Sequence, residues 1–281
     1  MRRLAVLSLH TSPLVQPGSG DGGGMNVYVR ELASALSQAG GGSTVFTRRT
    51  DDHTPTVVDV EPGFRVVHID AGPYDLPKED LPGVVDEFTD GVASYLTSHP
   101  GHDGLLANYW LSGVSGHRLK HELGLPLLTI FHTLARVKAE TGDPEPRRRV
   151  EAEMAVVGCS DLMLANSSEE RRQLVDLYGA DRARIEVVPP GVDHAFFTPG
   201  SQSVARRATG LGDGPVMLFA GRIQPLKGVD VAVRALDMLG RSDVRLVVVG
   251  GASGAKGEAE ERRLHELADV HGLVGRVQFV P

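Results

Sequence analysis

The stretch His10-Thr-Ser-Pro-Leu-Val-Gln-Pro-Gly-Ser-Gly-Asp-Gly-Gly-Gly-Met-Asn26 decides the fold of this chain. An apolar run from Leu4 to Leu9 precedes it and has the length and branching of a buried strand. After it, apolar residues recur at the spacing of one helix face: Met25, Val29, Leu32 and Leu36. The sequence therefore predicts a strand, a glycine-rich loop and a helix, in that order.

The glycines between Gly18 and Gly24 let a phosphate or a sugar approach the backbone, because glycine has no Cβ. The first amides of the following helix have no internal partner, and the helix dipole attracts anions. The loop contains no Gly-x-x-x-x-Gly-Lys-Ser, and its Gly18-x-Gly20-x-x-Gly23 stands eight residues after the predicted strand rather than in a tight turn. Neither a purine triphosphate nor a nicotinamide cofactor is therefore indicated. A long β-α loop without a ligand is the alternative.

The composition indicates a folded chain with one large domain or two ordinary ones. Of its 281 residues, 41% are hydrophobic, which is enough for a sizeable core. The formal charge of -7 argues against a general nucleic-acid-binding protein. A single cysteine, Cys159, excludes an intrachain disulfide, and its neighbours Val156 and Val157 indicate a small buried thiol rather than a nucleophile.

The start, Met1-Arg-Arg-Leu-Ala-Val-Leu-Ser-Leu, weakly resembles a signal peptide. Its apolar run is short and leads into His10-Thr-Ser-Pro without a small-residue cleavage site, so a first strand is expected. No run approaches the roughly 18 apolar residues of a membrane helix. A cytoplasmic protein without a membrane partner is expected.

Strands and helices are expected to alternate along the rest of the chain. Strands are predicted at residues 44–47, 64–69, 104–108, 126–131, 161–165, 185–188, 216–220, 246–249 and 277–280. Helices are predicted at 78–96, 109–123, 147–157 and 229–239, with one that Ser167 or Ser168 caps and one that ends at 271. Residues 51–63 are expected to form a loop or a hairpin, and 138–146 a polar, mobile loop.

This alternation predicts an α/β fold with parallel sheets that helices cover on both faces. The stretch from Pro189 to Gly200 interrupts the pattern, which places a domain boundary there. We expect a Rossmann-like domain at 1–190, a linker at 191–212 and the first half of a second such domain at 213–281. Three strands make only half of a doubly wound sheet.

Residues that suit a polar ligand follow the carboxyl ends of several predicted strands, where ligands gather in open parallel sheets. They are His10, Asn108, Tyr109, Trp110, His132, Thr133, Arg222 and Lys227. Either histidine alone could be a structural residue whose hydrogen bonds are all made within the protein. Together, beside a glycine-rich loop, they indicate a polar ligand bound by many hydrogen bonds.

Arg222 and Lys227 flank a turn between a predicted strand and a predicted helix. The planar fork of arginine, the point charge of lysine and free helix amides all suit phosphate oxygens. Such a cluster would stabilise negative charge on a departing diphosphate. The alternative is a pair of solvated surface cations.

Other chemistries lack their motifs. The sequence contains no Gly-x-Ser-x-Gly, Cys-x-x-Cys, His-Glu-x-x-His or Asp-x-Asp pattern. The pairs Asp51-Asp52 and Glu169-Glu170 are adjacent in sequence and are expected to be solvated. No metal site of the protein's own is predicted.

Six motifs together resemble the retaining glycosyltransferases of family 4. They are His10-Thr-Ser-Pro, Gly20-Asp-Gly-Gly-Gly-Met-Asn-Val-Tyr28, Ala71-Gly-Pro-Tyr74, Asn108-Tyr-Trp-Leu-Ser-Gly113, Phe131-His-Thr-Leu134 and Gly221-Arg-Ile-Gln-Pro-Leu-Lys-Gly228. The resemblance runs the length of the chain. It implies a GT-B architecture, in which two Rossmann-like domains face each other across a cleft.

The resemblance also implies an activity. Family members with these motifs transfer N-acetylglucosamine from UDP-GlcNAc to 1D-myo-inositol 3-phosphate with retention and release UDP, the first step of mycothiol biosynthesis in actinobacteria. No cofactor is required, although Mg²⁺ is compatible with the reaction.

By the same resemblance, the acceptor is bound by His10, Asp21, Gly22, Gly23, Gly24, Met25, Asn26, Lys78, Tyr109, Thr133 and Arg149. The donor is bound by Gln16, Pro17, Gly24, Arg222 and Lys227. Among the adjacent arginines 147–149 the assignment to Arg149 rests on position alone. No catalytic residue is assigned.

The chain departs from the family by ending before a Glu-x7-Glu motif that contacts the donor. It is therefore expected to be a fragment of a longer enzyme or a truncated, inactive relative, prone to aggregation or partial disorder beyond about residue 200. Two other functions stay open: another family 4 transferase with a phosphorylated acceptor, and a non-catalytic sugar-phosphate-binding module. Both a monomer and a homodimer are compatible with the sequence.

Overall fold

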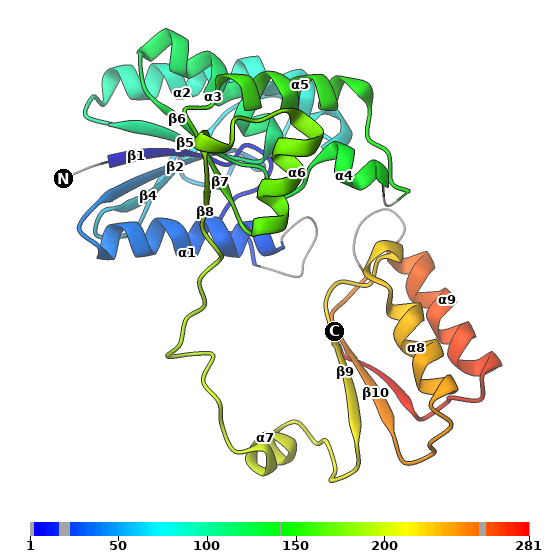
Figure 1. Ribbon diagram of the computed structural model, residues 1–281. Helices are drawn as coiled ribbons and strands as arrows, with labels where there is room; N and C mark the ends of the chain where they lie inside the picture. Colours follow the sequence, from blue (N-terminus) through cyan, green and yellow to red (C-terminus); the bar gives the residue numbers. More distant parts are fainter. Residues whose placement is uncertain (1–2, 17–22, 141, 253–256, 281) are drawn as a thin grey trace. The chain divides into compact units, whose positions relative to one another are not determined.

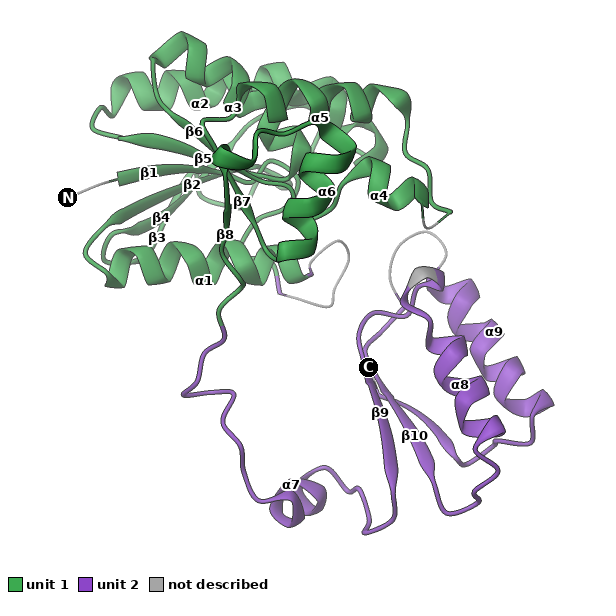
Figure 2. Ribbon diagram, viewed as in Figure 1, with its two compact units in different colours: residues 1–15, 24–191 green, residues 16–23, 192–281 purple. Residues whose placement is uncertain are grey.

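The structure of the protein is a computed structural model that describes residues 3–16, 23–140, 142–252 and 257–280 (Figure 1). The chain divides into two compact units (Figure 2). Unit 1 comprises residues 1–15 and 24–191, and unit 2 comprises residues 16–23 and 192–281.

Unit 1 is built on a sheet that has eight strands among its described residues, in the order β3-β4-β2-β1-β5-β6-β7-β8. The strands are β1 Arg3–Leu7, β2 Gly42–Arg48, β3 Val57–Glu61, β4 Phe64–Ile69, β5 Gly104–Asn108, β6 Leu127–Ile130, β7 Leu162–Ala165 and β8 Ile185–Val187. All neighbours pair in parallel except β3 and β4, which form an antiparallel hairpin. The carboxyl ends of the parallel strands therefore meet at one edge, as the alternation predicts.

Helices cover both faces of this sheet (Figure 1). They are α1 Gly24–Gln38, η1 Lys78–Val84, α2 Val85–Ser98, α3 Tyr109–Leu123, α4 Ala135–Glu140, α5 Arg147–Cys159, α6 Ser168–Tyr178 and η2 Arg182–Arg184. Along β1 the side chains alternate: Leu7 packs in one core cluster with Phe88 of α2, whereas Val6 packs in another with Val29 of α1. Both faces of the sheet are thus buried.

Unit 2 contains a parallel sheet in the order β11-β10-β9. Its elements are α7 Gln202–Ala208, β9 Val216–Ala220, η3 Pro225–Lys227, α8 Val229–Met238, β10 Arg245–Val249, α9 Gly257–Val270 and β11 Val277–Val280. Helices α8 and α9 lie on one face, against which Met217 and Phe219 pack (Figure 1). Leu218 points to the opposite face and is 66% exposed. Among the described residues, the expected cover on both faces is therefore present in unit 1 and not in unit 2.

Several local predictions need correction. Residues 78–84 form a 3-10 helix because Pro82 interrupts the expected α-helix. The expected polar loop after residue 137 begins inside α4, and α7 lies in the predicted linker. Both helices are too short to show a clear periodic pattern.

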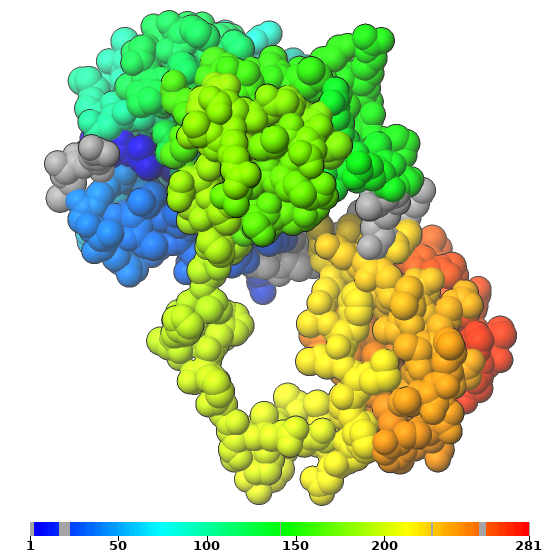
Figure 3. Space-filling model, viewed as in Figure 1, coloured from blue at the N-terminus to red at the C-terminus, as the bar shows by residue number. Residues whose placement is uncertain are grey.

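The stretch from 189 to 200 is exposed throughout (Figure 3). Phe196 and Phe197 are 78% and 64% exposed, and their rings contact each other at 5.0 Å between centroids. None of the helices in the described parts of the chain is both long enough and apolar enough to cross a membrane.

Candidate active site

In unit 1, predicted site residues meet at the carboxyl ends of three neighbouring strands, β1, β5 and β6. His10 follows β1, and its ring centroid lies 5.4 Å from that of Tyr109, which follows β5. His132 follows β6, and its Nε2 lies 3.0 Å from Oδ1 of Asn108, the last residue of β5. Side chains that are distant in sequence are thus brought together by parallel pairing.

The backbone at two of these residues adopts a left-handed conformation. Tyr109 has a φ of 74° and His132 a φ of 61°. At His132 the chain makes a tight turn, because the amide of Thr133 donates to the carbonyl of Phe131 at 2.7 Å. Such conformations cost about 1–3 kcal/mol each in residues other than glycine, and they cluster at functional sites.

His132 is held neutral by its surroundings. Burial lowers the pKa of His132 to about 4. The neutral ring donates from Nε2 to Asn108, and the ring of Tyr28 meets it edge-on at 5.1 Å. Asn108 is fully buried, and no partner for its Nδ2 lies among the described residues. This amide is therefore a donor suited to a ligand at the strand end.

The three adjacent arginines have different surroundings. Arg149 is 3% exposed, and its guanidinium carbon lies 5.0 Å from the centroid of the Tyr109 ring. Its Nη2 donates to both the carbonyl and the hydroxyl of Thr133, each at 3.1 Å. Arg147 is 91% exposed and pairs with Glu151 at 2.7 Å. Of the three, Arg149 therefore lies with Tyr109 and Thr133 in the described structure.

Two glutamates that the sequence analysis missed hold Arg149. Glu145 lies 2.9 Å from Nη1, and Glu153 accepts from Nε at 2.8 Å. Glu153 is fully buried and also accepts from the amide of Ala135, at 2.9 Å, and from the hydroxyl of Tyr178. The signal in the sequence was their spacing, because both are four residues from Arg149. Glu153 lies one turn further along α5, and Glu145 lies just before the helix begins at Arg147.

The glycine-rich stretch is described only in part. Asn26 is 2% exposed, and its Nδ2 donates to Oγ1 of Thr11 at 2.6 Å and to the carbonyl of Ser12 at 2.5 Å. These bonds tie the first turn of α1 to the segment after β1. An added Cβ at Gly24 would meet no atom within 4 Å, so the space there is open.

The remaining predicted residues of this stretch are Gln16, Pro17, Asp21, Gly22, Gly23 and Met25. Gln16 is exposed, and Gly23 and Met25 are half-buried. Pro17, Asp21 and Gly22 lie outside the described residues.

Lys78 is an exposed residue at the start of η1. The following residue, Glu79, accepts a bond from Arg148 at 3.3 Å, which links this segment to the start of α5. The loop before Lys78 is held by Arg48, which is 6% exposed and donates to the carbonyls of Pro73 at 2.7 Å and Tyr74 at 3.1 Å. Lys78 therefore lies on a segment that is bonded to the start of α5.

In unit 2, Arg222 and Lys227 lie in the turn between β9 and α8, as predicted. Arg222 is half-buried and Lys227 is exposed. The turn is anchored by Ile223, which is fully buried and whose amide donates to the carbonyl of Gly251 at 2.9 Å. Gly250 has a φ of 131°, and a Cβ there would lie 2.2 Å from the carbonyl oxygen of Gly221. Close backbone packing thus positions the two cations.

The cysteine prediction needs correction. Cys159 is half-buried rather than buried, and its Sγ lies 3.4 Å from Nε2 of His121. With His117 these residues form a group of possible metal ligands at the far end of α3 from Tyr109.

Comparison with known proteins identifies the family of the chain. Residues 23–191 match the family described as glycosyl transferase 4-like domain, and residues 201–281 match glycosyl transferases group 1. The chain therefore belongs to the glycosyl transferase 4-like family, and it is a glycosyltransferase.

Individual relatives carry a more specific name than the family. Over 293 aligned residues the chain is 49% identical to the D-inositol 3-phosphate glycosyltransferase of Xylanimonas cellulosilytica, with 99% of this chain and 70% of the relative covered. It is 47% identical to the D-inositol 3-phosphate glycosyltransferase of Actinosynnema mirum, with 100% of this chain and 70% of the relative covered.

Solved structures support the fold. Sucrose-phosphate synthase from Thermosynechococcus elongatus matches with a TM-score of 0.90 and 29% identity, covering 100% of this chain and 70% of that one. HepE of Anabaena, solved in complex with UDP-glucose, matches with a TM-score of 0.73 and 18% identity, covering 100% and 69%. The fold is thus α/β and GT-B-like.

Proposed function

We propose that this protein is a D-inositol 3-phosphate glycosyltransferase, which transfers N-acetylglucosamine from UDP-GlcNAc to 1D-myo-inositol 3-phosphate with retention and releases UDP. This is the first step of mycothiol biosynthesis. The proposal is supported by relatives of that name at 46–49% identity over nearly the whole chain.

The observation that carries the proposal is the buried guanidinium of Arg149 beside Thr133 and Tyr109. A phosphate dianion binds well to the planar guanidinium group of an arginine that has a hydroxyl group next to it. In the structure Glu145 pairs with Nη1, and its side chain is 20% exposed, whereas Glu153 is fully buried. The acceptor phosphate replaces Glu145, and Glu153 continues to orient the guanidinium.

The ring hydroxyls of inositol need neutral donors and acceptors. Nδ2 of Asn108 lies at the end of β5, next to Tyr109, and supplies one such donor. His10, which contacts the Tyr109 ring, and Asn26 contribute further polar groups from the segments that flank the glycine-rich stretch. Each matched hydrogen bond contributes about 0.5–1.5 kcal/mol, so several together select one polyol phosphate.

Catalysis rests on positioning and on stabilising the leaving UDP, without a covalent protein nucleophile. Arg222 and Lys227 meet the charge of the diphosphate as it develops. His132 stays neutral at physiological pH, because its pKa is about 4, so it acts as a hydrogen-bonding group and not as an acid.

The test is UDP release from UDP-GlcNAc, measured with and without 1D-myo-inositol 3-phosphate on the chain of 281 residues. Release that depends on the inositol phosphate is the expected result. Fructose 6-phosphate, offered alone in place of the inositol phosphate, is the alternative acceptor for comparison. It is chosen because sucrose-phosphate synthase matches this chain with a TM-score of 0.90.

A second candidate, a transferase with a hexose-phosphate acceptor, is supported if fructose 6-phosphate alone triggers release. Binding of inositol phosphate in a calorimeter without any release supports a non-catalytic binding module. Either result contradicts the proposed activity for this chain.

A further inference from the structure

Three side chains with metal-ligand chemistry gather on the surface of unit 1, at the end of α3 remote from Tyr109. They are His117 and His121 of α3 and Cys159, the last residue of α5. One ligand atom from each lies within 4.8 Å of the others. The Sγ of Cys159 is 3.4 Å from Nε2 of His121, and the two imidazole centroids are 5.2 Å apart.

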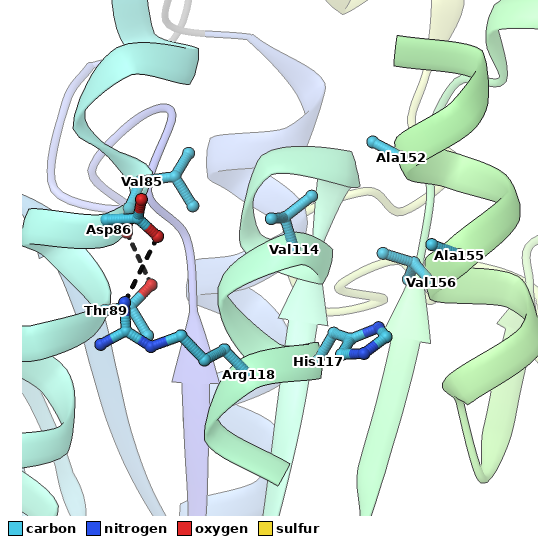
Figure 4. A pocket seen from close by; sticks show the side chains of 9 residues that line it. All are labelled: Val85, Asp86, Thr89, Val114, His117, Arg118, Ala152, Ala155 and Val156. Atoms are coloured by element: carbon cyan, nitrogen blue, oxygen red, sulfur yellow. Dashed lines mark hydrogen bonds and ion pairs between the residues drawn. The ribbon is translucent and has the colours of Figure 1, made fainter. Parts of the chain in front are cut away.

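The helices dictate this convergence. Residues four apart on a helix share a face, so His117 and His121 point the same way. The two helices approach closely at Gly113, where an added Cβ would lie 2.9 Å from Val156 of α5. Figure 4 shows His117 between α3 and α5, beside a groove of about 320 Å³ that Val114 and Ala155 also line.

The imidazole of His117 is half-buried and lies on the side of α3 that faces α5 (Figure 4). A neutral imidazole offers one ring nitrogen as a metal ligand. The two imidazoles and the thiol therefore offer two nitrogen ligands and one sulfur ligand at one place.

We propose that His117, His121 and Cys159 form a binding site for a zinc-class divalent cation, with solvent in the fourth position. Zinc takes nitrogen at about 2.0–2.1 Å and thiolate sulfur at about 2.3 Å, which places tetrahedral nitrogen and sulfur ligands about 3.5 Å apart. The distance from Sγ to Nε2 is already 3.4 Å. Binding exchanges the thiol proton for the metal, and the proton leaves to solvent.

The surroundings allow the ion to enter. His121 is exposed, so the cluster can be reached from solvent. The nearby ammonium of Lys120 lies 2.7 Å from a carboxylate oxygen of Asp161, which offsets its positive charge. The ion would join the end of α3 to the end of α5, the two helices whose opposite ends carry Tyr109 and Arg149. Its role is therefore stabilisation of unit 1 rather than chemistry at the acceptor site.

The test is a titration of the full chain, without an affinity tag, with Co²⁺ as a coloured substitute for zinc. We expect a single equivalent to bind, with thiolate-to-cobalt charge-transfer absorption in the near ultraviolet that added Zn²⁺ abolishes. Cys159→Ser should remove that absorption, and His117→Gln and His121→Gln should each weaken cobalt binding at least tenfold. His53→Gln is the matched control, because His53 is 91% exposed on another segment of unit 1.

A second measurement uses the unaltered chain, so it does not depend on the folding of a variant. Saturating Zn²⁺ should protect Cys159 from alkylation by iodoacetamide and raise the midpoint of thermal unfolding of unit 1 by roughly 5–10 °C. Absence of the charge-transfer band, or alkylation at the same rate with and without zinc, would show that the cluster is only a hydrogen-bonded thiol and imidazole.

Discussion

A single nitrogen of Arg149, Nη2, donates to both the carbonyl and the hydroxyl oxygen of Thr133, at 3.1 Å each. The bond to the carbonyl fastens α5 to the tight turn that follows β6. The bond to the hydroxyl fixes the rotamer of Thr133. If the acceptor phosphate binds at Arg149 as proposed, its position is therefore coupled to the left-handed conformation of the neighbouring His132.

Arg149→Lys tests this coupling. Lysine keeps the charge but loses the fork, so the acceptor KM should rise about 10- to 100-fold, which corresponds to about 1.5–3 kcal/mol for a charge-assisted hydrogen bond. The donor KM should change little. Steady-state kinetics in each substrate provide the measurement, with Arg147→Lys as the exposed control. An equal rise of both KM values would place Arg149 outside the acceptor site.

Glu153→Gln should destabilise unit 1 by about 3 kcal/mol. The carboxylate is fully buried and accepts from Arg149, Ala135 and Tyr178, and an amide would turn an N–H toward one of these donors and leave Arg149 with less compensating charge. Urea unfolding monitored by circular dichroism measures the change. Glu151→Gln, on the exposed side of α5, should shift the stability by less than about 0.5 kcal/mol. Equal stabilities of the two variants would argue against the buried network.

The stability of unit 1 should fall as the pH decreases from about 6.5 to about 4. The pKa of His132 is about 4 in the folded chain and about 6.5 in the unfolded chain, so the unfolded chain binds more protons in this window. The folded state is then disfavoured by up to about 3 kcal/mol at the low end. Urea unfolding at pH 7.5 and pH 5 measures the effect.

His132→Asn is the control for the pH dependence, because asparagine tolerates a positive φ. The variant should lose less stability than the parent chain between the two pH values. An identical loss in both proteins would mean that other groups cause the dependence.

Lys227→Gln should lower kcat about 100-fold or more in the proposed transferase. Removal of one donor that stabilises a developing charge typically has an effect of this size. The acceptor KM should stay the same, because the proposed acceptor-binding groups lie in unit 1. Initial rates of UDP release at saturating acceptor measure the change, and Arg207→Gln on α7 is an exposed control. Full activity of Lys227→Gln would remove the lysine from the donor site.

Gly250→Ala should disrupt the turn that carries Arg222. The new Cβ would lie 2.2 Å from the carbonyl oxygen of Gly221, and the φ of 131° is strained for alanine. Gly251→Ala is the neighbouring control, since a Cβ there meets no atom within 4 Å. Limited proteolysis of unit 2 should therefore be faster for the first variant alone. Equal cleavage rates would contradict this description of the turn.

The grouping of site residues at the strand ends was predictable, because the alternation of strands and helices along the chain implies that the strands pair in parallel. His10, Tyr109 and Thr133 come from different parts of the sequence, and each follows a short apolar run with the length of a buried strand. Once those strands pair in parallel, their carboxyl ends must share one edge. The capping of α6 by Ser167, whose hydroxyl accepts from the amide of Glu170, was also predictable, because it depends only on residues that are close in sequence.

The partners of these residues were not predictable. Which of the arginines 147–149 is buried depends on the rotation of α5 against its neighbours, which a short polar helix does not reveal. The left-handed backbone at Tyr109 and His132 has no clear sequence signature. Tyrosine does not favour it, and histidine, although enriched there, adopts it in only a small fraction of cases. The link from Cys159 to His121 spans 38 residues and depends on the close approach of α3 and α5.

The place of β1 in the sheet has a consequence for synthesis. Strand β1 precedes the other described strands of its sheet in the chain and lies between β2 and β5, and β6, β7 and β8 follow outward from β5. On one side, each strand that leaves the ribosome can therefore add to an edge that already exists, without the insertion of a strand between two finished neighbours. On this side the sheet of the nascent chain grows outward. The strand ends that carry His10, Tyr109 and Thr133 are therefore assembled in the order of translation.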